Sequence, residues 1–188
     1  MYRSFESSLV EHCAPTLAGI KPASLFRCTP QSAADIPQTA KHWDRALSPL
    51  GLRVQVLKEC PRTGDCIIYV YRPDWVGKLL TDGKNRRFLA DCGYQSGDTH
   101  AFLQQLSERL CLEQDYPHEI GLFLGYPLAD VIGFIENRGQ RYTCCGCWKS
   151  YSDPVRAQAY FDRCRQCTSQ YRALYAQTSD VLRLVVAA

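Results

Sequence analysis

The sequence has no long hydrophobic run. None of its 188 residues lies in an uninterrupted stretch of the about 18 apolar residues that a membrane-spanning helix requires. The first twelve residues, M-Y-R-S-F-E-S-S-L-V-E-H, contain acids and serines where a secretory signal needs an apolar run. We therefore expect a cytoplasmic protein with no membrane partner.

The sequence also lacks a strong excess of charge and the common catalytic motifs. The net charge is only +3, and 46% hydrophobic and 22% charged residues are typical of a globular protein. Of the four histidines, His118 precedes a glutamate, but position 122 is Leu, which excludes the H-E-x-x-H zinc protease motif. Gly121, Gly125 and Gly133 follow helical patterns and match neither a dinucleotide fingerprint nor a phosphate-binding loop.

Hydrophobic periodicity indicates an α+β fold. Strands are predicted at residues 25–28, 52–57, 66–71 and 142–151, and helices at 99–112 and 128–137. Asp153 and Pro154 are typical of the start of a helix, so a long C-terminal helix should follow. We expect one domain over residues 1–188, with a small, mostly antiparallel sheet of about four strands packed with helices. Residues 1–115 would form a helix and hairpin part, and residues 116–188 a cysteine-rich helix–helix–strand–helix part.

Cysteine is the one abundant reactive residue. The chain has eleven cysteines, and five of them fall within 24 residues: Cys144, Cys145, Cys147, Cys164 and Cys167. An odd number in a reducing compartment favours metal ligands, reactive thiols or buried apolar residues over a disulfide framework. The C-x-C and C-x-x-C pairs are separated by sixteen residues, as in zinc ribbons, and soft thiolates suit zinc or an iron–sulfur cluster. The leading hypothesis is a metal-binding carrier, sensor or accessory factor in metal handling or redox metabolism, with a protein partner in that process.

Three other interpretations remain open. Cys164 and Cys167 lie about ten residues into their predicted helix on its apolar stripe, so burial in the core would explain them equally. A thiol-dependent enzyme could use a cysteine of the 144–147 segment, with Arg141, Lys149 or His118 tuning it. Seven basic and two acidic residues between positions 138 and 172 also allow a nucleic-acid-binding module with structural zinc, which is the less favoured alternative.

A second group of candidates lies near the N-terminus. His12 adjoins Cys13, and Cys28 follows fifteen residues after Cys13. Adjacent residues of a helix point about 100° apart, so His12 and Cys13 would not form a catalytic pair with each other. Cys13 belongs to an apolar stripe, and burial is the favoured interpretation. These three residues are kept as additional candidates for a metal site.

Several stretches resemble one known family. They are H-C-A-P-T-L-A-G-I-K at 12–21, I-Y-V-Y-R-P at 68–73, H-E-I-G-L-F-L-G-Y-P-L-A-D-V-I-G-F-I-E-N at 118–137 and C-G-C-W-K-S-Y at 145–151. Together they resemble an uncharacterised family of small proteins from anaerobic bacteria, a domain of unknown function. The resemblance implies no activity. In its pattern other residue types usually stand at Cys147 and Cys164, so a site built from all five cysteines would be particular to this chain.

Overall fold

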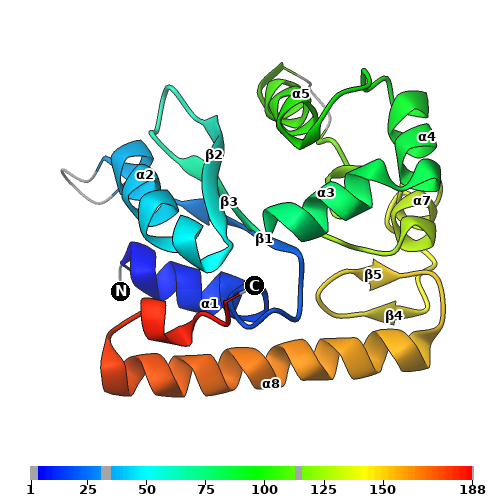
Figure 1. Cartoon of the computed structure of the whole chain (residues 1–188). Helices are drawn as coiled ribbons and strands as arrows, with labels where there is room; N and C mark the ends of the chain where they lie inside the picture. Colours follow the sequence, from blue (N-terminus) through cyan, green and yellow to red (C-terminus); the bar gives the residue numbers. More distant parts are fainter. Residues whose placement is uncertain (1–3, 31–34, 113–115, 188) are drawn as a thin grey trace. The chain divides into compact units, whose positions relative to one another are not determined.

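The structure is a computed structural model that describes residues 4–30, 35–112 and 116–187 (Figure 1). The chain divides into two compact units. Unit 1 comprises Met1–Trp75 and Cys167–Ala188, and unit 2 comprises Val76–Gln166. The predicted α+β class, small antiparallel sheet and long C-terminal helix are confirmed. Whether the whole chain forms a single domain stays a prediction.

Unit 1 is built on a three-stranded antiparallel sheet with strand order β1-β3-β2. Its elements in chain order are α1 (Phe5–Leu17), β1 (Ala23–Cys28), α2 (Ile36–Leu47), η1 (Ser48–Leu50), β2 (Arg53–Glu59) and β3 (Cys66–Tyr71). The central strand β3 is the apolar run C-I-I-Y-V-Y, which suits a strand with neighbours on both edges. The predicted strands at 25–28, 52–57 and 66–71 are therefore confirmed.

The core of unit 1 lies between this sheet and helices α1 and α2. Leu9, Leu17, Leu47, Ile68 and Val70 are completely buried in one hydrophobic cluster. The cluster also contains Val181 and Leu184, the latter from the short helix η2 (Leu182–Leu184). Burial of apolar surface on this scale is the main force that stabilises a unit of this kind.

Unit 2 is mainly helical. Its helices before the hairpin are α3 (Pro73–Thr81), which begins in unit 1, α4 (Gly83–Asp91), α5 (Thr99–Leu112), α6 (Ile120–Phe123) and α7 (Leu128–Glu136). The predicted helix 99–112 is confirmed, and its stripe of Phe102, Leu103, Leu106 and Leu110 is buried. Helix α7 ends one residue before the predicted position, and Gly139, at a φ of 70°, donates from its N–H to the carbonyl of Phe134.

The segment 142–151 is not the single strand that its sequence suggested. It is a hairpin of two short strands, β4 (Cys144–Cys145) and β5 (Lys149–Ser150), joined by a turn in which the Gly146 N–H bonds to the Trp148 carbonyl. Gly146 permits the turn to approach α8, because a Cβ atom there would lie only 2.2 Å from Cδ2 of Phe161. The single-strand prediction failed because the turn at Gly146 packs closely against Phe161. That contact lies fifteen residues further along the chain and leaves no local pattern in the sequence.

Helix α8 (Pro154–Thr178) is the long C-terminal helix. Its first turn is capped as predicted, since the Asp153 carboxylate accepts from the N–H groups of Val155 (2.9 Å) and Arg156 (3.2 Å). In the part of the chain that the structure describes, no helix combines the length and apolar character that crossing a membrane requires.

Candidate functional site

Asp130 holds the short hairpin of unit 2 against helix α7. The side chain is only 2% exposed, and its carboxylate accepts four hydrogen bonds from the hairpin and the residues after it. Oδ2 accepts from the Trp148 indole (2.7 Å) and the Ser150 hydroxyl (3.0 Å), and Oδ1 accepts from the N–H groups of Tyr151 (2.8 Å) and Ser152 (3.0 Å). Burial would raise the pKa of Asp130, but these hydrogen bonds outweigh it and lower the pKa.

Trp148 joins the hairpin to its surroundings through aromatic contacts. Its ring stacks on Tyr126 at 4.8 Å between centroids and meets Phe161 edge to face at 4.6 Å, with Tyr160 at 5.3 Å. The Tyr126 hydroxyl also donates to the backbone carbonyl of Cys147 (3.2 Å). Such offset and edge-to-face pairs add to the stability given by burial alone. The position of the hairpin is thus fixed by side chains rather than by a long strand ladder.

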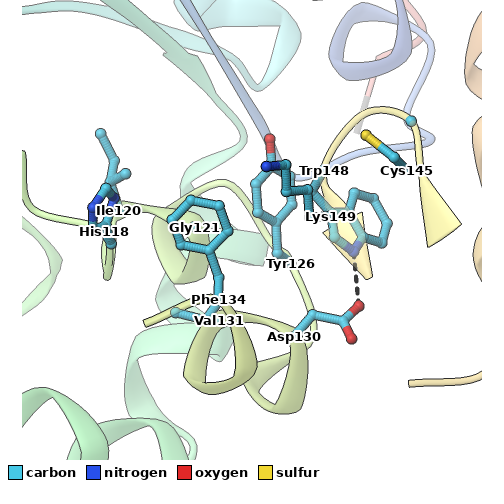
Figure 2. Close-up of a pocket in the computed structure, with 11 residues that line it drawn as sticks. His118, Ile120, Gly121, Tyr126, Asp130, Val131, Phe134, Cys145, Trp148 and Lys149 are labelled. Carbon is cyan, nitrogen blue, oxygen red and sulfur yellow. Dashed lines mark hydrogen bonds between the residues drawn. The ribbon is translucent and has the colours of Figure 1, made fainter. Parts of the chain in front are cut away.

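A pocket of about 350 Å³ lies between the hairpin and helices α6 and α7 (Figure 2). Its wall is mostly apolar and aromatic, formed by Ile120, Gly121, Tyr126, Val131, Phe134, Gly146 and Trp148. The polar groups among the lining residues are His118, Asp130, Cys145 and Lys149. A concave, mainly apolar cavity with a few convergent polar groups is typical of a small-molecule site.

Lys149 supplies the positive charge of this pocket. Its ammonium donates to the carbonyl of Gly139 (2.8 Å) and lies over the rings of Tyr142 (5.0 Å) and Phe134 (5.9 Å). An ammonium has three N–H donors, so this single carbonyl does not exhaust its hydrogen-bonding capacity. The group is therefore oriented by the protein and can still donate to a ligand.

Cys145 and His118 are the other polar side chains available to a ligand. Cys145 is exposed and is the direct cross-strand partner of Lys149, so their side chains project from the same face of the hairpin. His118 is exposed, and its ring meets Phe134 edge to face at 4.9 Å. Three residues that the sequence singled out, Cys145, Lys149 and His118, thus line one pocket.

The five cysteines of the predicted metal cluster have different surroundings. The Cys144 thiol is 3.4 Å from the side-chain oxygen of Gln158, whereas Cys145 lines the pocket. Burial, and after it the charges of the Cys164 and Cys147 thiols, raises the pKa of the Tyr160 phenol. Among residues 4–30, 35–112 and 116–187, no three His, Cys, Asp or Glu side chains gather into a group that could hold a metal ion.

Cys164 and Cys167 are both buried in α8, as the apolar stripe indicated. Cys164 belongs to unit 2 and Cys167 to unit 1. Burial raises the pKa of the Cys167 thiol.

The N-terminal candidates lie in unit 1 and Arg141 in unit 2. His12 is exposed and stacks on Phe26 at 5.7 Å. Cys13 is completely buried, and that burial raises its pKa. Burial, together with the charge of Asp65, also raises the pKa of Cys28, which faces Cys66 across the sheet. Arg141 is exposed at a φ of 59° and does not line the pocket.

The sequence did not identify Tyr126, Asp130, Phe134 or Trp148 as parts of a site. One signal was present for Asp130, a carboxylate inside the apolar helical run L-A-D-V-I-G-F-I-E. A charged residue at a buried helical position requires partners, and here the hairpin provides them. The aromatic residues carried no comparable signal, because core packing explains them equally.

The comparisons with known proteins give a family and no activity. No curated protein and no solved structure matches the chain. The family model described as "Protein of unknown function (DUF3793)" matches residues 9–185, which is nearly the whole chain. The chain therefore belongs to the DUF3793 family of proteins of unknown function.

Proposed function

We propose that the protein binds a small, largely apolar molecule in the pocket between the hairpin and helices α6 and α7. The observation that carries this proposal is the pocket itself, an aromatic-walled cavity of about 350 Å³ within one compact unit. All its lining residues fall in two stretches that carried the family resemblance, 118–137 and 145–151. A role common to the family is therefore better supported here than at the five cysteines.

The polar groups suggest which end of the ligand is charged. Asp130 already accepts four hydrogen bonds, so its carboxylate is committed to holding the hairpin. Lys149 is the remaining charged group of the pocket, with His118 and Cys145 as further polar side chains. We infer a ligand with an apolar, planar body and an anionic or carbonyl oxygen that accepts from Lys149.

Two fluorescent probes of similar shape and different charge test this proposal. Anilinonaphthalene sulfonate carries a negative charge, and N-phenylnaphthylamine lacks it. We expect both to bind with a stoichiometry of one. Lys149→Met should weaken binding of the sulfonate probe by about tenfold, which corresponds to the loss of one charge-assisted hydrogen bond. Binding of the uncharged probe should not change.

Two control variants locate the effect. Lys84→Met removes an exposed lysine of α4 in the same unit and should leave the binding of both probes unchanged. Cys145→Phe adds bulk at the pocket and should weaken both probes, with circular dichroism used to verify folding. Binding of the uncharged probe that is insensitive to Cys145→Phe would contradict the proposal.

Metal binding by the cysteines is the second candidate, and the placement of five cysteines within 24 residues favours it. Two thiols would need further ligands to complete a zinc or iron–sulfur site. We propose for this case a cytoplasmic carrier, sensor or accessory factor with a redox or metal-handling partner. The nucleic-acid-binding module with structural zinc stays a prediction.

The metal proposal is tested by metal and acid-labile sulfide content after anaerobic purification. Stoichiometric zinc, or iron with sulfide, should be lost in Cys147→Ser and Cys164→Ser and retained in Cys111→Ser, which changes an exposed cysteine of α5. Metal content that is absent in all proteins, or equal in all of them, would contradict this candidate.

A further inference from the structure

The pocket places a nucleophile beside a cation. Cys145 and Lys149 are direct cross-strand partners, and both line the pocket. Directly opposite residues of an antiparallel pair have Cβ atoms about 4.5–5.5 Å apart, close enough for both side chains to reach one functional group of a ligand. We propose that Cys145 accepts the acyl group of an apolar acyl thioester bound in this pocket, which deepens the proposed function and rests on it.

The position of Cys145 distinguishes it from the other cysteines of the hairpin. Cys144 lies on the side of the hairpin that faces Gln158, and Cys147 lies between β4 and β5, where its carbonyl accepts from the Tyr126 hydroxyl. Cys145 is the hairpin cysteine among the described lining residues of the pocket, and it is exposed. A molecule held by the aromatic wall would therefore meet the Cys145 sulfur.

Lys149 is placed to assist at the carbonyl oxygen. The bond to Gly139 and the rings of Tyr142 and Phe134 hold its ammonium. When a thiol adds to a carbonyl carbon, negative charge develops on the oxygen, and a preorganised donor stabilises that charge. An ammonium held in this way, at the strand position opposite Cys145, has the chemistry for this task.

The transfer is balanced without a metal, an oxidant or a reductant. The Cys145 sulfur forms a bond to the carbonyl carbon, its proton passes to solvent, and the carbonyl electron pair moves to the oxygen, which accepts from Lys149. The intermediate then expels the thiolate of the leaving thiol, which takes a proton from solvent. The products are S-acyl-Cys145 and a free thiol, so one thioester is exchanged for another.

The probe for this step is the 2-naphthoyl thioester of N-acetylcysteamine, with the acetyl thioester as the small control. Acylation is followed by mass spectrometry, and hydroxylamine should reverse it. Trypsin leaves Cys144, Cys145 and Cys147 in one peptide, between Arg141 and Lys149. Assignment therefore uses Cys145→Ser and the double variant Cys144→Ser, Cys147→Ser.

We expect naphthoyl transfer to that peptide to be lost in Cys145→Ser and retained in the double variant. N-phenylnaphthylamine should suppress the transfer by competition. Lys149→Met should slow it by at least about tenfold, whereas Lys84→Met should not. Transfer from the acetyl thioester should be insensitive to N-phenylnaphthylamine and to Lys149→Met, because an acetyl group is too small to occupy the aromatic pocket.

Three results would overturn the acyl transfer. They are equal labelling of Cys145→Ser and the unmodified protein, labelling that N-phenylnaphthylamine does not suppress, and no labelling although the probe binds. In the third case the ligand-binding proposal stands and the acyl transfer alone fails. Failure of N-phenylnaphthylamine to bind would reject both.

Discussion

The two β-structures of this protein are stabilised in different ways. The sheet of unit 1 has six register pairs between β1 and β3, and side chains such as Ile68 and Val70 enter the buried core. The hairpin of unit 2 has two register pairs, Cys144 with Ser150 and Cys145 with Lys149. An isolated two-stranded hairpin is marginally stable in water, so this one depends on Asp130, Trp148 and the close approach of Gly146 to Phe161.

The difference between the sheet and the hairpin bears on where the candidate site lies. In the sheet, backbone pairing and apolar burial support each other. In the hairpin, a few side chains at one end support the strands, and the pocket lies beside them. Functional groups are commonly placed on such short connecting segments, which a rigid scaffold holds in position.

The largest effect is expected in the sheet. Ile68 lies at the centre of β3, opposite Phe26 and Val56, and is completely buried. Ile68→Ala should lower the free energy of unfolding by about 2–5 kcal/mol through lost burial and the cavity left behind. Urea denaturation measures this loss, and hydrogen exchange should show weaker protection in all three strands.

Val155→Ala is the control for this change. Val155 is 76% exposed, so its loss should alter stability by no more than about 0.5 kcal/mol. Loss of protection in β3 alone, with β1 and β2 unchanged, would show that the sheet does not behave as one cooperative structure.

Gly146→Ala should weaken the hairpin with little change in the sheet. The added Cβ would lie 2.2 Å from the Phe161 ring, and overpacking of this kind costs about 1–3 kcal/mol. We expect faster hydrogen exchange at Lys149 and Ser150 and weaker binding of N-phenylnaphthylamine. Gly83→Ala is the matched control, because nothing lies within 4 Å of its added Cβ; it should be neutral or slightly stabilising. Equal effects of the two substitutions would refute the close-approach argument.

Asp130→Asn should lower the free energy of unfolding by a similar or smaller amount than Gly146→Ala, and this loss should depend on pH. An amide keeps the shape but brings N–H donors against the existing donors, which costs about 1–3 kcal/mol. The pKa of Asp130 is lowered in the folded protein. Its contribution to stability is therefore complete above the unfolded value, near 3.9, and is lost as the pH falls through the lower folded value.

The measurement for Asp130 is urea denaturation of both proteins from pH 7 to pH 3. The difference in unfolding free energy between the unmodified protein and Asp130→Asn should be largest at pH 7 and shrink below about pH 5. Asp162→Asn changes an exposed carboxylate that pairs with Arg165, and it should give a small difference at every pH. A difference for Asp130→Asn that stays constant down to pH 3 would contradict the assigned role of the carboxylate.

Much of the fold could be predicted from short stretches of the sequence. The stripe of α5 and the Asp153-Pro154 start of α8 are local signals, because a helix repeats every 3.6 residues and its first N–H groups need a cap. The site could be predicted only in part. Cys145, Lys149 and His118 were identified by residue type, but their shared pocket was not. The metal hypothesis relied on spacing, which does not determine the direction of each thiol.

The sequence by itself determined most of the helices and strands of this protein and its family, because periodicity, capping and motifs act over a few residues. The tertiary structure alone decided that segment 142–151 turns back at Gly146, that Asp130 supports it, and that residues 118–134 and 145–149 enclose a pocket. These outcomes depend on contacts between residues distant in the chain. Packing selects such contacts, and no local pattern specifies them.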